Sequence, residues 1–268
     1  MTGALDRVEA FMRGLLAAMA RRPLVLGICG AQGSGKSTLS DGLAARARAD
    51  GLRVAVLSLD DLYLTKGERT VLARDVHPLL ATRGVPGTHD IDLGLSVLDA
   101  LTRPGRVLLP RFDKAVDDRA PTGVLVDGPV DLVLLEGWCV GALPQGTAAL
   151  ATPANTLERT RDPDGRWRRH VNERLAGEYQ RLFARLDALI LLAAPDFAVV
   201  RDWRIQQEES LRARLRDAGS STCQTMTDAQ VTAFIQFYER LTRHILTEMP
   251  GRADLVLRLD ADRRVLEG

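Results

Sequence analysis

The sequence contains little cysteine, lysine or aromatic residue, and it has no strong excess of charge of either sign. Its 268 residues include three cysteines, none of them in a CxxC pair, and four histidines scattered along the chain. This pattern argues against a disulfide framework and against a structural zinc site. The 36 basic and 35 acidic residues nearly cancel, whereas a dedicated nucleic-acid-binding or membrane-surface protein usually carries a strong basic excess.

Long apolar runs are also absent, since none approaches the ~20 residues that a membrane-spanning helix needs. The apolar stretch at residues 14–20 is short and runs directly into two arginines and a proline. Apolar residues recur at helical spacing over residues 5–19, which predicts an amphipathic helix within residues 1–22, packed on the domain, rather than a signal peptide. We therefore expect a cytoplasmic protein with neither nucleic acid nor membrane as a partner.

Apolar runs alternate with helical patterns along the rest of the chain. Runs of Val, Leu and Ile without polar alternation are typical of parallel strands that are covered on both faces. The predicted strands are 24–29, 53–58, 131–135, 188–193 and 254–259, and the predicted helices are 36–49, 92–101, 171–186, 195–216 and 227–249. This order predicts an α/β fold with a doubly wound, mainly parallel sheet in a single domain, residues 1–268. Within an insert at 144–170, residues 144–164 are predicted to form a loop.

The residues from Gly30 to Ser37 (GAQGSGKS) match the P-loop pattern in full, between a predicted buried strand and a predicted helix. Glycines let successive backbone N–H groups turn toward phosphate oxygens, and the helix N-terminus adds the positive end of its dipole. Lys36 would carry a point charge to the β- and γ-phosphates, and the Ser37 hydroxyl would bind Mg²⁺. The predicted ATP-binding residues of this P-loop nucleoside triphosphate hydrolase (kinase) fold are Gly30, Ala31, Gln32, Gly33, Ser34, Gly35, Lys36, Ser37 and Thr38.

Carboxylates follow two other predicted strands. Asp60 and Asp61 come after the strand at 53–58, and Glu136 ends the apolar run 132–135 as the acid of a Walker B element does. In a parallel sheet these strand ends face the same crevice as the P-loop. One of the two adjacent aspartates is expected to be an N-cap or a solvated turn residue. Asp60 is the favoured candidate for accepting a hydroxyl proton or binding Mg²⁺, and Glu136 is a candidate for holding the water shell of the metal.

Loops within residues 83–120 carry the polar side chains expected on the substrate side of the site. Clustered cations there could clamp an anion, because a guanidinium group pairs bidentately with carboxylate or phosphate; the alternative is a solvated, charge-balanced loop. The candidate substrate-binding residues are Asp60, Tyr63, Arg83, His89, Asp90, Arg111, Lys114 and Arg119. Arg201 and Arg204, on the lid-like helix at 195–216, could close over the transferring phosphoryl group, or Arg204 could simply pair with Glu208 on an exposed helix face.

These elements together resemble the plant-type D-glycerate 3-kinase family, within the P-loop kinases that include uridine kinase, phosphoribulokinase and pantothenate kinase. The resemblance covers roughly residues 24–265 and rests on GAQGSGKST, SLDDLYLT, GTHD, LPRFDK, LLEGW, VNERLAGEY and WRIQQE in that order. It implies transfer of the γ-phosphoryl group of ATP to a hydroxyl of D-glycerate, giving 3-phosphoglycerate and ADP. It also implies that Asp60 is the general base and that Lys36, Arg201 and Arg204 stabilise transition-state charge. The implied Mg²⁺ ligands are Ser37 and an acid, Asp60 or Glu136.

Other readings of the same motifs stay open. Residues 159–170 (RTRDPDGRWRRH) are longer and more basic than the resemblance predicts, and their role is unassigned. Uridine, pantothenate or a sugar could be the acceptor, although an aromatic content of 4% disfavours a nucleoside pocket and the basic loops favour a small anionic, hydroxylated substrate. A nucleotide-hydrolysing regulator or GTP-dependent chaperone is the alternative from another class, but the sequence lacks the Asn-Lys-x-Asp-like element expected of a guanine reader. Oligomeric state is left open.

Overall fold

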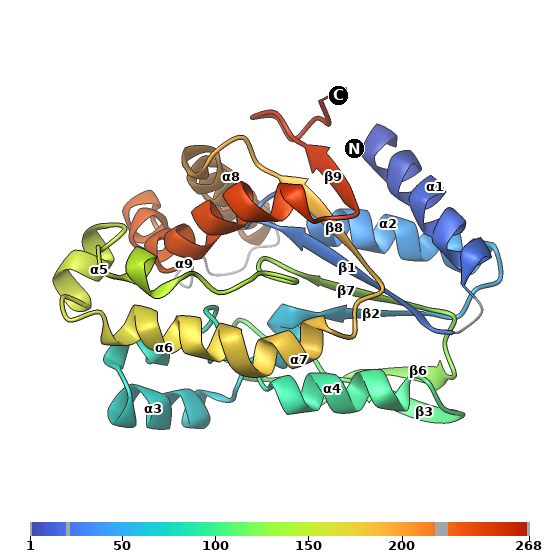
Figure 1. The fold of residues 1–268 in the computed structure, drawn as a ribbon, viewed down its shortest axis with the longest axis horizontal. Helices are drawn as coiled ribbons and strands as arrows, with labels where there is room; N and C mark the ends of the chain where they lie inside the picture. Colours follow the sequence, from blue (N-terminus) through green and yellow to red (C-terminus); the bar gives the residue numbers. More distant parts are fainter. Residues whose placement is uncertain (1, 20–21, 218–224, 267–268) are drawn as a thin grey trace.

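A five-stranded parallel sheet runs through the centre of the molecule, in the order β2-β7-β1-β8-β9 (Figure 1). The computed structural model describes residues 2–19, 22–217 and 225–266. The strands are β1 (Leu24–Gly30), β2 (Val54–Ser58), β7 (Leu132–Gly137), β8 (Ala188–Ala193) and β9 (Leu255–Arg258). Neighbouring strands in this sheet pair in parallel throughout. The predicted α/β fold and the position of each predicted strand of this sheet are confirmed.

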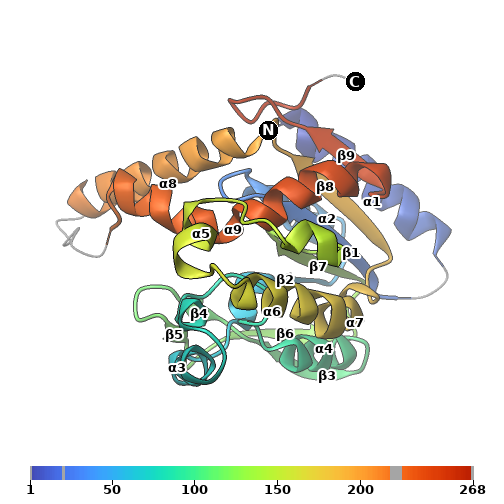
Figure 2. The ribbon, with the colours of Figure 1, turned by 60° about the vertical axis from the view of Figure 1, so that its left-hand side comes forward.

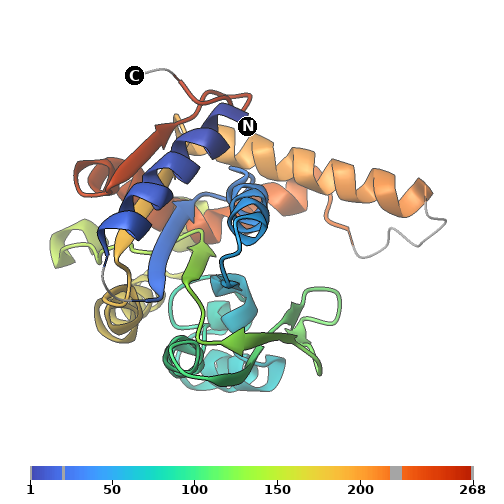
Figure 3. The same cartoon turned by 90° about the vertical axis from the view of Figure 1, so that its right-hand side faces the viewer.

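Helices cover both faces of the sheet, and every residue of β1, β7 and β8 is buried as a result. On one face α2 (Lys36–Ala49) packs against β1, β2 and β7, and α1 (Thr2–Ala18) contacts α2. On the other face lie α6 (Arg166–Arg174), α7 (Gln180–Phe183) and α9 (Asp228–Glu248) (Figures 1 and 3). The uninterrupted apolar runs of the sequence are explained by this two-sided covering.

The chain between β2 and β7 forms a second layer beside the sheet (Figure 2). This layer has two helices and two small antiparallel sheets, β3–β6 and β4–β5. Its elements are α3 (Lys66–Asp75), α4 (Ile91–Ala100), β3 (Gly105–Leu109), β4 (Phe112–Asp113), β5 (Asp118–Arg119) and β6 (Val124–Gly128). Of these, α4 was predicted as a helix at 92–101. The helix α3 was not predicted, although Thr65 and Glu68 form a complete capping box at its start.

The insert between β7 and β8 is more helical than the sequence predicts. The predicted loop at 144–164 contains a 3₁₀ turn, Thr147–Leu150, and the helix α5 (Thr156–Arg161), which Asn155 caps. Six residues are too few to show helical periodicity, so the loop prediction was wrong here. The helix predicted at 171–186 begins earlier, with α6, and continues into α7 through a π-helical turn, Leu175–Tyr179.

The structure also bears on the predicted N-terminal helix and on the lid-like helix. The first helix ends at Ala18 rather than near residue 22, and residues 20–21 lie outside the described part of the chain. The long helix α8 (Phe197–Asp217) agrees with the lid-like helix predicted at 195–216; it contacts α9 and projects from the body of the molecule (Figure 3). Within the described residues, no helix has both the length and the apolarity required to cross a membrane.

A buried ion pair ties the insert to α9. Glu158 of α5 is completely buried and accepts hydrogen bonds from Arg240 of α9, from Nε at 2.7 Å and from Nη2 at 2.6 Å. Glu158→Ala removes the carboxylate from the Arg240 guanidinium, which is only 13% exposed and keeps just neutral acceptors such as the carbonyl of Ala149. We expect the free energy of unfolding, measured by denaturant titration, to fall by about 3 kcal/mol.

The matched control is Arg181→Ala, which breaks the exposed ion pair with Asp92. An exposed pair contributes less than about 1 kcal/mol, so this variant should remain close to the parent protein. Equal losses in the two variants would show that the Glu158–Arg240 pair does not hold the insert in place.

Candidate active site

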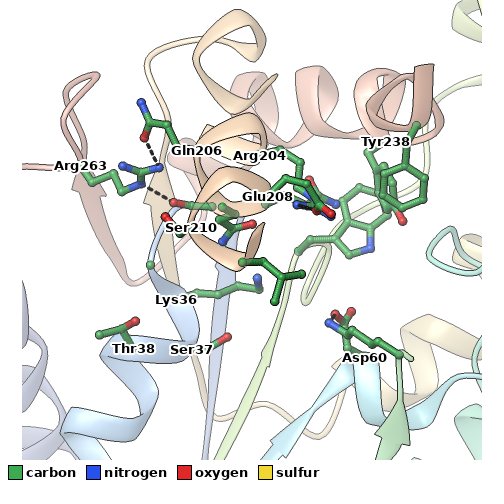
Figure 4. A pocket seen from close by; sticks show the side chains of 18 of the residues that line it. Lys36, Ser37, Thr38, Asp60, Arg204, Gln206, Glu208, Ser210, Tyr238 and Arg263 are labelled. Carbon is green, nitrogen blue, oxygen red and sulfur yellow. Dashed lines mark hydrogen bonds and ion pairs between the residues drawn. The ribbon is translucent and has the colours of Figure 1, made fainter. Parts of the chain in front are cut away.

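The carboxyl ends of β1, β7 and β2 meet along one edge of the sheet, because these strands are parallel neighbours. The register pairs Ile28 of β1 with Glu136 of β7, and Ser58 of β2 with the same glutamate. The P-loop therefore starts beside Glu136, and Asp60 lies just beyond Ser58. Lys36 and Asp60 line one cavity of about 700 Å³ at this edge (Figure 4).

The P-loop has the backbone shape that an anion requires. Gly33 and Gly35 adopt φ values of +80° and +89°, which favour glycine. Gly35 is the N-cap of α2 and supplies no capping side chain, so the first N–H groups of the helix are open to phosphate. The predicted ATP-binding residues that line the cavity are Gln32, Gly33, Gly35, Lys36, Ser37 and Thr38. The others, Gly30, Ala31 and Ser34, are buried.

Oxygen atoms suited to a hard cation lie beside the P-loop. The Ser37 hydroxyl donates to Glu136 Oε1 at 3.2 Å, and Lys36 Nζ is 3.9 Å from Glu136 Oε2. Glu136 Oε2 is buried and accepts no hydrogen bond. Hydroxyl and carboxylate oxygens are the ligands that Mg²⁺ takes, so this pair fits a magnesium ion. No cluster of three or more His, Cys, Asp or Glu within the described residues could hold a metal by itself.

Asp60 faces the cavity with both of its carboxylate oxygens engaged. Tyr63 donates its hydroxyl to Oδ1 at 2.7 Å, and Lys114 donates Nζ to Oδ2 at 2.7 Å. Burial acts to raise the pKa of Asp60, but the ammonium groups of Lys114 and Lys36 and both hydrogen bonds outweigh burial and hold that pKa well below its usual range. Asp60 is therefore ionised at neutral pH.

The neighbouring Asp61 has a structural environment. It accepts hydrogen bonds from the Arg111 guanidinium and from the backbone N–H of Phe112, and neither Asp61 nor Arg111 lines the cavity. These contacts fix the strand β4 next to the turn that carries Asp60. The two adjacent aspartates thus have different partners, and Asp61 is held by an ion pair rather than being the N-cap or solvated turn residue that the sequence predicts for one of them.

His89 packs behind Tyr63, outside the cavity lining. Its ring stacks on Tyr63 at 4.6 Å between centroids, and Nδ1 shares a hydrogen bond with the Tyr179 hydroxyl. Its side chain is buried and does not line the cavity. Burial lowers the pKa of His89 to about 3, so the imidazole is neutral and positions Tyr63 rather than contributing a positive charge.

The remaining predicted substrate-binding residues fall into two groups. Arg83 lines the cavity, lies 5.4 Å over the Phe112 ring and pairs with Asp117. Asp90 and Arg119 do not line it: Asp90 caps α4 through Leu93 N and pairs with Arg119 at 2.8 Å. For those two residues the structure resembles the charge-balanced loop that the sequence left as the alternative.

The arginines of α8 also differ in position. Arg204 lines the cavity and pairs with the buried Glu208 at 2.7 Å, the i,i+4 pair that the sequence allows (Figure 4). Arg201 is 47% exposed, pairs with its neighbour Asp202 and does not line the cavity. Arg204 is therefore the arginine of the pair that this conformation brings to the site.

Several cavity residues were not selected from the sequence. They come from α8, α9, the loop after β7 and the C-terminal turn, and they are Trp138, Gln206, Gln207, Ser210, Leu211, Phe234, Tyr238 and Arg263. Trp138 lies within LLEGW, so its motif carried a signal. Tyr238 stands on an amphipathic helix with nothing local to mark it, and its hydroxyl donates to the carbonyl of Arg83 only because α9 folds back over the cavity.

The neutral state of His89 predicts a pH dependence of stability. The unfolded chain protonates this imidazole below about pH 6.5, whereas the folded protein does so only near pH 3, so lowering the pH through this window favours unfolding. From about pH 7 to about pH 5 the free energy of unfolding should fall by about 2 kcal/mol on account of His89. Denaturant titrations of the parent and His89→Asn measure the difference; parallel pH profiles would contradict the assignment.

Comparisons with known proteins agree with this geometry. The model of the family "Methylmalonyl Co-A mutase-associated GTPase MeaB" matches residues 6–69, which include the P-loop but less than half of the chain. The uncharacterized kinase mug58 of Schizosaccharomyces pombe is 34% identical over 230 residues, covering 81% of this chain and 79% of that protein. The chloroplastic D-glycerate 3-kinase of Arabidopsis thaliana is 30% identical over 255 residues; the match covers 90% of this chain and about half, 53%, of the plant protein.

A solved structure extends the likeness to the whole fold. D-glycerate 3-kinase from Cryptococcus neoformans superimposes with a TM-score of 0.79 and 27% sequence identity, covering 98% of both chains. The likeness to this structure thus covers the whole fold and not the P-loop region alone. The chain belongs to the family of P-loop kinases that includes mug58 and is related to D-glycerate 3-kinase.

Proposed function

We propose that this kinase transfers the γ-phosphoryl group of ATP to a hydroxyl of D-glycerate, giving 3-phosphoglycerate and ADP in a Mg²⁺-dependent reaction. One observation carries the proposal: Lys36 of the P-loop lines the same cavity as Asp60, which follows β2, and Lys114, which pairs with Asp60. Lys36 suits the phosphate chain of ATP, Asp60 suits the attacking hydroxyl of the acceptor, and Lys114 suits a carboxylate of the acceptor. The likeness to the plant and fungal D-glycerate 3-kinases supports the choice of acceptor.

The acceptor end of the cavity favours a small anion. Two cations, Arg83 and Lys114, line it together with the phenol groups of Tyr63 and Tyr238. Lys114 is 60% exposed and is held by one ion pair, so its ammonium group can turn to a substrate carboxylate while Asp60 takes the substrate hydroxyl. A compact hydroxy acid can satisfy both groups at once, which a neutral nucleoside cannot.

Asp60 would act on the acceptor hydroxyl. Phosphoryl transfer passes through a loose transition state, so the protein contributes mainly by positioning the reactants and balancing charge. The ionised carboxylate accepts the hydrogen bond of the attacking hydroxyl and directs its oxygen toward the P-loop. The proton moves to Asp60 as the new P–O bond forms, and a base of low pKa is sufficient because that transfer is late.

The charge on the transferring group would be balanced by Lys36 and Arg204. Lys36 extends from the start of α2 toward the cavity, and Arg204 faces it from α8 (Figure 4). Ser37 and Glu136 would hold the magnesium ion, which when bound neutralises charge on the β- and γ-phosphates. Closing α8 over the site would exclude water and suppress ATP hydrolysis without an acceptor.

The acceptor assignment predicts a selective stimulation of ADP release. With Mg-ATP, D-glycerate should stimulate turnover strongly, whereas L-glycerate, uridine, pantothenate and ribulose 5-phosphate should not. A coupled assay for ADP measures all five acceptors under one condition. Stimulation by another acceptor would replace the substrate, and release of ADP that no acceptor alters would favour the regulatory class of nucleotide hydrolases.

The role of Asp60 predicts a loss of turnover without a loss of nucleotide binding. Asp60→Asn keeps the size of the side chain but removes its charge, and turnover should fall ~10²–10⁴-fold with ATP affinity nearly unchanged. Steady-state kinetics measures turnover, and titration with a non-hydrolysable ATP analogue measures the nucleotide affinity. Asp61→Asn is the control: its amide oxygen still accepts from Phe112 N, so most of the turnover should remain. Normal turnover in Asp60→Asn would remove this residue from the mechanism.

A further inference from the structure

A tight turn near the C-terminus packs against the P-loop, and neither the sequence motifs nor the proposed reaction gives it a role. The turn follows β9. Asp260 Oδ1 accepts hydrogen bonds from the backbone N–H groups of Asp262 and Arg264, at 2.9 and 2.8 Å. Arg263 adopts φ +65°, an uncommon value for a residue other than glycine. Together these features direct the Arg263 side chain toward the phosphate end of the cavity, as Figure 4 shows.

The Arg263 guanidinium joins three segments that are distant in the sequence. It donates from Nε to the carbonyl oxygen of Gly33 at 2.6 Å and from Nη2 to Gln206 Oε1 at 2.9 Å. It also lies 5.1 Å over the ring of Trp203, whose Nε1 donates to the carbonyl of Ala261 in the same turn. The P-loop, the first half of α8 and the C-terminal turn are therefore linked through one side chain.

The Gly33 carbonyl belongs to the peptide group between Gly33 and Ser34, at the turn of the P-loop. The N–H group of that same peptide, from Ser34, donates to Ala31 O at 3.1 Å, so Arg263 engages the other polar group of this peptide. A Cβ on Gly33 would lie 2.6 Å from Trp203 Cβ, so Trp203 packs directly on the glycine. The peptide cannot rotate without breaking both hydrogen bonds and displacing Trp203.

We propose that Arg263 is a positioning residue for the phosphate chain. By holding the Gly33 carbonyl outward, it keeps the N–H groups of the P-loop residues after Ser34 directed at phosphate oxygens. A phosphate cradle needs this separation, with carbonyls turned away from the anion and N–H groups toward it. The inference rests on the proposed use of ATP but on no particular acceptor. It predicts an effect on every polyphosphate ligand, independent of the base.

Affinities for ADP and for inorganic tripolyphosphate, both with Mg²⁺, test the proposal. Arg263→Met keeps an unbranched stem over Trp203 but removes the donors to Gly33. Because a hydrogen bond from a charged donor is lost, both affinities should fall about tenfold and by the same factor. Arg263→Lys should recover part of the loss, since an ammonium group can still donate to a single carbonyl.

The adjacent Arg264 provides the control. Its side chain is 78% exposed and pairs only loosely with Asp262, so Arg264→Met should leave both affinities unchanged. Thermal unfolding of each variant verifies folding; should Arg263→Met fail to fold, Arg263→Leu, which also lacks a donor, takes its place, with the same equality of losses expected.

Two results would overturn the proposal. Weaker binding of ADP with normal binding of tripolyphosphate would mean that Arg263 contacts the nucleoside instead, and unchanged binding of both would mean that it is only structural. Because no acceptor is present, failure of this inference is distinguishable from failure of the proposed function.

Discussion

The parallel pairing of β1 with β7 and of β7 with β2 is the constraint on which the site depends. It aligns three strand ends, so residues a hundred positions apart, such as Lys36 and Glu136, reach one another across a single edge. Helices on both faces bury β1 and β7 completely and β2 in part, and they leave that edge as the open part of the sheet. Each functional group then extends from a rigid element, while the second layer and α8 enclose the space between them.

Three of the cations that line the cavity are paired with carboxylates. The ion pairs are Lys114 with Asp60, Lys36 with Glu136, and Arg204 with Glu208. In each pair a cation that suits an anionic ligand is held by a carboxylate until a ligand competes for it. Desolvation of a charged site is costly when the charge is unpaired, and the pairing offers a physical reason why so polar a cavity is compatible with a stable fold.

Sequence patterns predicted the parts of this protein that depend on local order. The P-loop and the strands of the sheet were found because their signals, a fixed motif and continuous apolar runs, each lie within a short stretch of the chain. The short helix α5 was missed because its stability comes from the distant Arg240, and Arg263 was missed because its contact with Gly33 spans nearly the whole chain. Charge alone likewise did not separate Arg83, which lines the cavity, from Arg119, which pairs with Asp90.

The identity of the phosphorylated product tests the account most directly. Incubation with Mg-ATP and D-glycerate, followed by ³¹P NMR of the mixture, distinguishes the products by chemical shift and coupling. The proposed function, in which Lys114 would hold the substrate carboxylate and the terminal hydroxyl would face Asp60 and the P-loop, predicts 3-phosphoglycerate in equal amount with ADP. Formation of 2-phosphoglycerate would contradict that orientation, and inorganic phosphate alone would contradict the assignment of D-glycerate as the acceptor.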